Sequence, residues 1–226
     1  MNVFLNNYFP NVMTKVPEFY ESIGQTFQMV IWSGVISLIL GTVIGIVLVI
    51  TRKGGLVENQ IVFQILDKIV NLFRSIPFII LLTGVMPLTR IIMGTAIGVE
   101  GAIVPLVFGT VPFFSRQIES ALSQVPAGLV EAAESMGNTK LQIITNVYLK
   151  ESIPQISRAV SITAISLIGL TAMAGVVGAG GLGDFAVRYG HDRNQTDVTL
   201  ATIIVLVILV SIIQLVGNFV AKKSSH

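Results

Sequence analysis

Cysteine is absent from this chain of 226 residues, and charged residues make up only 12% of it. The first absence excludes disulfides, thiolate chemistry and cysteine-based metal sites. The second leaves about half the charge of a soluble domain, which is too little polar surface to cover a water-soluble globule. Histidine is scarce as well, since only His191 and His226 occur, with no metal-ligand spacing. We therefore expect lipid as the main solvent and no metal or cofactor site, and the net charge of +2 is too small to indicate nucleic acid.

Long apolar runs are what the sequence has instead, and the mean hydropathy is +0.82. A helix that crosses about 30 Å of hydrocarbon needs about 20 mostly apolar residues. Five runs meet this need, which predicts an all-α integral membrane protein with one transmembrane domain over residues 1–226. The predicted spans are about 26–50, 69–87, 96–114, 159–183 and 198–221. Pro77 is expected to kink the second span, and Pro105 and Pro112 to make the third irregular.

The distribution of Lys and Arg predicts how these spans are oriented, because cytoplasmic segments carry an excess of positive charge. An odd number of spans places the two ends of the chain on opposite sides. With the C-terminus in the cytoplasm, ten of the 14 basic residues lie inside: Arg52, Lys53, Lys68, Arg74, Arg116, Lys140, Lys150, Arg158, Lys222 and Lys223. The four outside are Lys15, Arg90, Arg188 and Arg193. We therefore expect the N-terminus outside and the C-terminus inside.

A glycine pattern, Gly178-x-Gly180-x-x-Gly183, matches the dinucleotide-binding motif letter for letter. That motif holds a pyrophosphate only between a buried strand and a helix. Here it ends an uncharged stretch that reads as a membrane helix, and the predicted topology places it on the outer side, away from cytoplasmic nucleotides. We interpret the glycines as residues that end the helix, permit tight helix contact or shape an outer loop. Since no Gly-x4-Gly-Lys-Ser/Thr phosphate loop occurs elsewhere, we do not expect the chain to use ATP itself or to be an enzyme.

The longest stretch without a convincing span is the predicted cytoplasmic loop 116–158. Pro126 suits the first turn of a helix, and Gly137 suits the left-handed position just past its end. These residues predict a short helix over about Ala127–Met136. Thr139 is placed to cap a second helix, which is expected to run through Leu149.

The short helix carries Leu129, Ala133 and Met136 along one stripe, and Ala132 lies beside them. Small residues in its middle offer a low-profile face to a partner protein. The same loop could equally pack on its own membrane domain. The residues alone do not separate these two interpretations.

The segment Glu131-Ala132-Ala133-x3-Gly137, followed nine residues later by Val147-Tyr148-Leu149, resembles the EAA signature of permease subunits of bacterial ABC importers, EAA-x3-G-x9-I-x-LP. Val147 replaces Ile and Lys150 replaces Pro, which puts the shape of the second helix in doubt but not the docking element. The resemblance implies a coupling helix that sits in a groove on a cytoplasmic ATPase subunit. The docking residues it implies are Leu129, Glu131, Ala132, Ala133, Met136, Gly137 and Leu149.

The likeness extends to NLFRSIPFIILL (71–82), GAIVPL (101–106) and GAGGLGDFAVRYG (178–190), which look like the methionine importer permeases. It implies import of methionine, L- and possibly D-, across the bacterial cytoplasmic membrane by a dimer of five-span subunits. The implied partners are a second copy, two ATPase subunits that use ATP-Mg and an extracellular substrate-binding lipoprotein. The outer segment is either a solvated loop or part of the surface that receives this lipoprotein, which the likeness favours. Its residues are Gly180, Gly181, Gly183, Asp184 and Arg188.

Three alternatives stay open at this stage. An importer of the same class could carry a related cargo, such as a methionine-containing dipeptide or another small amino acid. An ion-coupled secondary transporter would need charged pairs near the midplane and an internal repeat. A membrane-embedded enzyme would need convergent polar groups within the spans. The sequence shows no convincing sign of the last two.

Overall fold

The computed structural model describes residues 8–224, so that Met1 and His226, the two ends whose sides the charge distribution predicts, lie outside the described residues. Within that range the chain is helical and contains no strand, which confirms the all-α class. The contacts divide the chain into two compact units. Unit 1 comprises Met1–Val35, Pro77–Phe108 and Ala164–Ile213, and unit 2 comprises Ile36–Ile76, Gly109–Thr163 and Gln214–His226.

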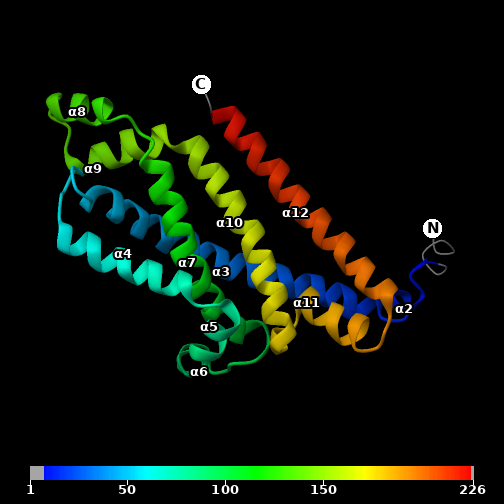
Figure 1. Cartoon of the computed structure of the whole chain (residues 1–226). Helices are drawn as coiled ribbons and strands as arrows, with labels where there is room; N and C mark the ends of the chain where they lie inside the picture. Colours follow the sequence, from blue (N-terminus) through cyan, green and yellow to red (C-terminus); the bar gives the residue numbers. More distant parts are fainter. Residues whose placement is uncertain (1–7, 225–226) are drawn as a thin grey trace. The chain divides into compact units, whose positions relative to one another are not determined.

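Four helices are long and apolar enough to cross a membrane, and each overlaps most of one predicted span (Figure 1). They are α3 (Val16–Thr51), α7 (Gly98–Leu122), α10 (Ile153–Ala174) with its π-helical extension η2 (Gly175–Ala179), and α12 (Thr196–Ser224). Several of their Ser and Thr side chains donate to the carbonyl four residues earlier, as Thr42 does to Leu38 O at 2.7 Å. This bond satisfies a hydroxyl that has no water to bind in hydrocarbon.

The second predicted span, 69–87, is not one helix. Helix α4 (Gln60–Ser75) belongs to unit 2, whereas α5 (Phe78–Gly84) and α6 (Met86–Met93) belong to unit 1. Ile76 between them is extended (φ −82°, ψ 123°) because the ring of Pro77 clashes with a helical residue before it. Pro77 also lacks an N–H to donate. The kink expected at Pro77 is therefore a complete break.

Helices α3 and α7 nevertheless run in the same sense. A Cβ on Gly41 would lie 2.7 Å from Cδ1 of Phe114, and one on Gly45 would lie 2.6 Å from Cβ of Ile118. Four residues along α3 thus correspond to four residues along α7. Two helices that cross a membrane in one sense must be joined by a segment that crosses back. The segment from α4 to α6 must therefore return across the membrane despite its break, which supports the predicted five crossings.

Helix α7 continues past residue 114, the predicted end of the third span, and ends at Leu122. Arg116, which would otherwise stop a span, is neutralised in place. Its guanidinium bonds to the carboxylates of Asp67 on α4 and Glu119 one turn along, the second at 2.6 Å. Since α10 already begins at Ile153, the connecting loop is 123–152 rather than 116–158. The helix also passes through Pro105 and Pro112 without a break.

Unit 1 contains the short elements α2 (Pro10–Met13), α11 (Gly181–Phe185) and the π-helix η3 (Ala186–His191). The backbone N–H and the side-chain amide of Asn11 both donate to Asp197 at 2.9 Å, which joins α2 to the start of α12. Phe185 is fully buried beside Phe19, with ring centroids 5.2 Å apart. These contacts hold the segment before α12 against the first turns of α3.

Candidate functional site

The loop between α7 and α10 carries a short helix, α8 (Ala127–Ser135), which begins directly after Pro126. Two backbone bonds close its end: Gly137 N–H donates to Glu134 O at 2.9 Å, and Asn138 N–H donates to Ala133 O at 3.2 Å. This pair of bonds is a Schellman motif, which requires a left-handed residue between helix and turn. Gly137 has φ +78°, so the predicted left-handed glycine is confirmed.

The chain turns back directly after α8. Gln142 N–H donates to Oγ1 of Thr139, and the Thr139 N–H donates to Oε1 of Gln142 at 2.8 Å, which forms a capping box. Helix α9 (Lys140–Ile143) starts at this cap and continues as the π-helix η1 (Ile144–Leu149). The prediction that Thr139 caps a second helix through Leu149 is confirmed. Figure 1 shows α8 and α9 as a helical hairpin beyond the end of α7.

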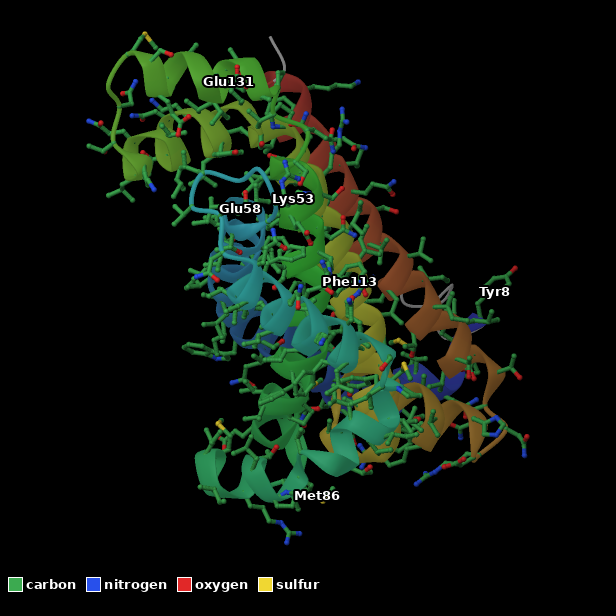
Figure 2. All side chains as sticks on the ribbon, turned by 60° about the vertical axis from the view of Figure 1, so that its left-hand side comes forward. Tyr8, Lys53, Glu58, Met86, Phe113 and Glu131 are labelled. Carbon is green, nitrogen blue, oxygen red and sulfur yellow. The ribbon has the colours of Figure 1, made fainter. Side chains whose placement is uncertain are left out.

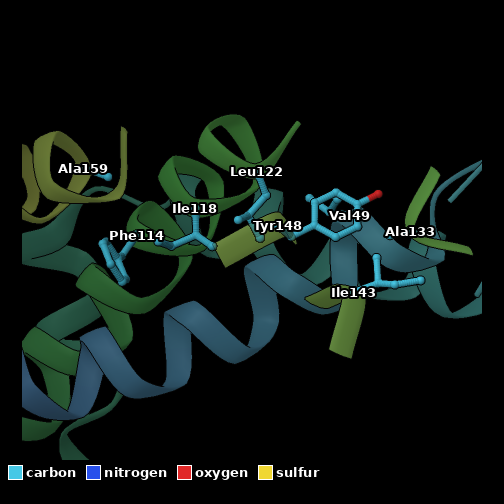
Figure 3. Packing of buried hydrophobic residues seen from close by; sticks show 8 residues of the cluster. All are labelled: Val49, Phe114, Ile118, Leu122, Ala133, Ile143, Tyr148 and Ala159. Atoms are coloured by element: carbon cyan, nitrogen blue, oxygen red, sulfur yellow. The ribbon is translucent and has the colours of Figure 1, made fainter. Parts of the chain in front are cut away.

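Helix α8 has a buried face. Ala133 is only 3% exposed and packs in a hydrophobic cluster that also contains Ile143 and Tyr148 from the other arm of the hairpin (Figure 3). Val49 of α3 and Phe114, Ile118 and Leu122 of α7 belong to the same cluster, as does Ala159 of α10. Ala133, one of the predicted docking residues, is therefore covered by its own chain, and the docking of this loop on an ATPase stays a prediction. A side chain as small as alanine fits under the π-helical arm, and the loop packs on its own unit through it.

The rest of the surface of α8, called the open face below, is exposed. Glu131 and Ala132 are exposed, as is Gly137 just past the helix end. Leu129 is 44% and Met136 75% exposed, so that these two apolar side chains project beyond the covered alanine. Figure 2 shows Glu131 on α8. The carboxylate of Glu131 has no hydrogen bond or ion pair with any residue in the range 8–224. The open face therefore carries two acidic side chains, Glu131 and Glu134, together with the apolar side chains of Leu129 and Met136.

The two ends of the loop are tied to the end of α7. Arg52, at the end of α3, donates from Nη1 to Oγ of Ser123 at 2.7 Å. Ser152, just before α10, donates from Oγ to Ala121 O at 3.3 Å. Together with the shared cluster, these bonds join α8 to the ends of α3, α7 and α10. The loop that carries α8 is thus attached to three long helices and is not loose.

The second arm of the hairpin supplies the cover. Tyr148 is 6% exposed, and burial raises the pKa of its phenol, which keeps the group neutral at physiological pH. Leu149 is half-buried against the same cluster, so it supports the hairpin from within. Nothing in the signature at 131–137 indicates the anchoring roles of Arg52, Ser123 and Ser152. The one available signal for these roles is that the three residues lie near the ends of predicted helices.

The glycine pattern after α10 forms a close helical contact. A Cβ on Gly175 would lie 2.6 Å from the backbone nitrogen of Asp184, and one on Gly183 would collide with Ala172 O. Glycine at these two positions lets α11 pack directly on the end of α10. The interpretation that the glycines end a helix and permit tight contact is confirmed, since Gly178 and Gly180 have φ +95° and +80°.

The first backbone N–H groups of α11, which have no acceptor within the helix, donate to side chains of α3. Gly181 N–H donates to Oε1 of Gln25 at 2.7 Å, and Leu182 N–H donates to Oγ1 of Thr26 at 2.8 Å. A dinucleotide motif needs such amides for a pyrophosphate. Both acceptors come from α3, a separation of 156 residues along the chain. The amides thus join α3 to α11 within unit 1 and offer no phosphate site.

The predicted outer surface is only partly accessible. Gly181 and Gly183 are buried and do not lie on an outer surface, whereas Gly180 is half-buried against Gln25; that this segment faces a binding protein stays a prediction. The lack of a side chain at these glycines serves packing. Arg188 is exposed and Asp184 half-buried, and they form an ion pair at 2.5 Å. Together with the half-buried Gly180, these are the residues of the predicted set that reach the surface.

Comparison with known proteins agrees with this architecture. The model of the family described as "Binding-protein-dependent transport system inner membrane component" matches residues 41–225. The probable D-methionine transport system permease protein MetI of Vibrio cholerae is 46% identical over 202 residues, which cover 89% of this chain and 90% of that protein. The protein of the same name from Pasteurella multocida is 41% identical over 214 residues, 93% and 99% of the two chains.

Solved structures of ABC transporters also match the chain over nearly its whole length. A chain from the native crystal form described as inward facing conformations of the MetNI methionine ABC transporter has a TM-score of 0.92 and 40% identity, covering 94% of this chain and 99% of that one. A structure of an amino acid ABC transporter with histidines, at 15% identity and a TM-score of 0.78, shares the fold alone. These matches confirm the resemblance drawn from the signature. The chain belongs to the family of binding-protein-dependent transport system inner membrane components and is the multi-pass permease subunit of an ABC transporter, not its ATPase.

Proposed function

We propose that this permease imports methionine across the bacterial cytoplasmic membrane. The observation that carries the proposal is the identity of 46% over 89% of the chain with a protein named for D-methionine transport. Identity of this extent includes the lining of the spans as well as the ATPase-facing loop. The methionine ABC transporter structure adds support, because it matches the chain over 94% of its length.

The open face of α8 is the contact with the cytoplasmic ATPase. Leu129, Ala132 and Met136 supply small and apolar contact area, and Glu131 supplies one charge for registration. Two copies of the permease form the pathway, and one ATPase docks on each copy. This chain binds no cofactor of its own, and the ATPases use ATP-Mg. Closure of the ATPases moves α8, and the tied ends of α3, α7 and α10 convert that movement into rocking between inward and outward states.

This assignment fixes the orientation of the chain. The loop that carries α8 lies in the cytoplasm, the N-terminus lies outside and the C-terminus lies inside. The excess of Lys and Arg on the same side supports it. The exposed pair of Arg188 and Asp184 then lies outside, where a substrate-binding lipoprotein delivers its cargo.

Uptake of labelled L- and D-methionine tests the cargo. Deletion of the chain is expected to abolish ATP-dependent, high-affinity uptake, and the intact gene is expected to restore it. Unchanged methionine uptake together with loss of uptake of a methionine-containing dipeptide or another small amino acid would assign the related cargo instead. Vesicles that contain ATP and an ionophore should still transport, whereas collapse of uptake with the ion gradient would indicate a secondary transporter.

Reporter fusions test the orientation. Fusions after Lys53, at Asn138 and at the C-terminus are all expected to report the cytoplasm. An external signal from the Asn138 fusion would overturn both the topology and the ATPase contact.

A further inference from the structure

Three buried hydroxyl groups in unit 2 make no hydrogen bond to any residue that the structure describes. They are Oγ of Ser37 on α3, Oγ1 of Thr110 on α7 and Oγ1 of Thr163 on α10. Their residues are 0%, 2% and 2% exposed. A hydroxyl without a partner in an apolar interior costs free energy, so buried polar groups are nearly always bonded. Three such groups therefore call for a common partner.

The neighbouring hydroxyls on the same helices show the usual solution. Ser33 donates to Met29 O at 2.5 Å on α3, and Ser115 donates to Val111 O at 2.7 Å on α7. Each uses the carbonyl four residues earlier on its own helix. Ser37, Thr110 and Thr163 have the same option and do not use it. Their hydroxyls are thus directed away from their own backbones and into the helix packing.

The helix registers place Ser37 and Thr110 at one level. Gly41 of α3 meets Phe114 of α7. Ser37 is four residues before Gly41, and Thr110 is four residues before Phe114. Residues four apart lie one turn along the same helix face. Since α3 and α7 run in the same sense, both hydroxyls lie one helical turn before the contact between Gly41 and Phe114.

The register of α10 brings Thr163 to this level. Ala159 packs in one cluster with Phe114, and Thr163 is four residues after it on a helix of opposite sense. A second contact gives the same result from the other direction. Leu167, four residues after Thr163, lies 3.4 Å from a Cβ built on Gly34, which is three residues before Ser37. Contacts on both sides of the level therefore bracket the three hydroxyls.

We propose that Ser37, Thr110 and Thr163 form one polar site at membrane depth that holds a single water molecule. A hydroxyl offers one donor and two acceptor lone pairs, and a buried water typically makes about three hydrogen bonds. Three convergent hydroxyls match that number. The helices are uncharged near the three hydroxyls, because α3 carries no ionisable residue between Glu21 and Arg52, α7 none between Glu100 and Arg116, and the chain none between Arg158 and Asp184, where Arg158 on α10 is exposed. A neutral ligand therefore fits the site better than an ion.

Ser37, Thr110 and Thr163 all belong to unit 2, one on each of the long helices α3, α7 and α10. A bridging water exchanges its bonds among hydroxyls more freely than interlocked side chains can slide. On the proposed transport function, the water lets α3, α7 and α10 shear against one another during each cycle.

Isosteric substitutions in the complete complex with its ATPase test the site. The variants are Ser37→Ala, Thr110→Val and Thr163→Val, singly and combined, and the control is Thr202→Val, whose hydroxyl is 1% exposed but bonds to its own helix. Each single change leaves the water and two hydroxyls short of a partner, and we expect Tm to fall by about 2–4 °C. The triple variant removes the whole site, so its Tm should be no lower than that of the worst single variant. The control should change Tm by less than any of the three.

The sign and additivity of these shifts decide the proposal. Three single changes that each raise Tm, with additive effects in the triple variant, would show three independent hydroxyls and overturn it. A Tm that depends on Na⁺ or K⁺ but not choline, and loses this dependence in the triple variant, would show a cation instead. High-resolution density should show a water within about 2.7–3.2 Å of at least two of the hydroxyls, and direct hydroxyl-to-hydroxyl bonds would refute it. None of these measurements uses the cargo, so a wrong cargo would not affect their outcome.

Discussion

Two neighbouring alanines in α8 have opposite surroundings, which makes them a matched pair for separating folding from ATPase docking. Ala133 is 3% exposed inside the cluster formed with Ile143 and Tyr148, whereas Ala132 is on the open face. The pair sits one residue apart on the same helix, so helix propensity and membrane insertion are the same for both. We therefore expect Ala132→Arg and Ala133→Arg to fail in different ways.

An arginine at position 133 must either bury its guanidinium or push α8 off the second arm of the hairpin. An unpaired buried charge costs about 3–5 kcal/mol. Since about 1 kcal/mol corresponds to about 2–4 °C for a domain of this size, Tm should fall by about 6 °C or more. An arginine at position 132 meets solvent and should change stability by no more than about 0.5 kcal/mol. In the complex it meets the ATPase and should weaken that contact by tenfold or more, equivalent to about 1.4 kcal/mol.

The assays are membrane insertion, thermal unfolding, co-purification with the ATPase and ATP-driven uptake in vesicles. The Ala132→Arg variant should insert and unfold like the parent but lose the ATPase and transport. Ala132→Ser is the matched control and should retain both. If Ala132→Arg binds the ATPase and transports normally, the open face of α8 is not the contact. If Ala133→Arg unfolds at the parent temperature, the inward position of Ala133 is wrong.

Three further changes have defined outcomes. Gly137→Ala places a Cβ in open space at a residue with φ +78°, so only the backbone cost of about 1 kcal/mol applies. Its Tm should fall by a few degrees and its uptake should be reduced. Gly137→Asn should show a smaller fall in both Tm and uptake. Gly45→Ala would put a Cβ 2.6 Å from Ile118 and 2.8 Å from the carbonyl oxygen of Ser115, so α3 and α7 must separate. Little folded protein should then accumulate. The control Gly24→Ala, whose Cβ would have no atom within 4 Å, should accumulate normally. Because burial raises the pKa of Tyr148 above its ordinary 10.0, its neutral form favours the folded state, and this share of stability is complete at neutral pH and disappears as pH rises above about 10. Tyr148→Phe should therefore flatten the fall in Tm at alkaline pH, and an unchanged fall would contradict the role of its burial.

Local chemistry predicted the shape of the candidate site well. Gly137 and Thr139 act through backbone conformation and capping, which depend on neighbours within four residues, so both could be identified before the structure. The orientation of Ala133 could not. An alanine suits a buried and an exposed position equally, and its cover comes from Tyr148 on another arm. The same limit applies to Gly181, whose amide partner Gln25 lies 156 residues away.

Hydropathy predicted where the long helices lie but not where they end. A charge normally limits a span, so Arg116 suggested that the third one stops at 114. The structure shows the charge paired with Asp67 and Glu119, and such a partner on another helix leaves no local signal. Pro77 did indicate a disturbance in the second span. Its severity depended on Ile76, which adopts an extended backbone and ends α4 outright.

The division of α8 into a covered face and an open face also bears on how different transporters coexist in one cell. The hairpin takes its shape from the buried Ala133 and from the backbone bonds of Gly137 and Asn138. Leu129, Glu131 and Met136 are exposed, so other side chains could replace them without changing that shape. If the open face is the ATPase contact, as proposed, mutations on it alter which ATPase is recognised while the hairpin still folds. A cell with many related importers needs each permease to select its own motor. Transplanting the open-face residues alone between two such permeases offers a route to exchange their motors without rebuilding either membrane domain.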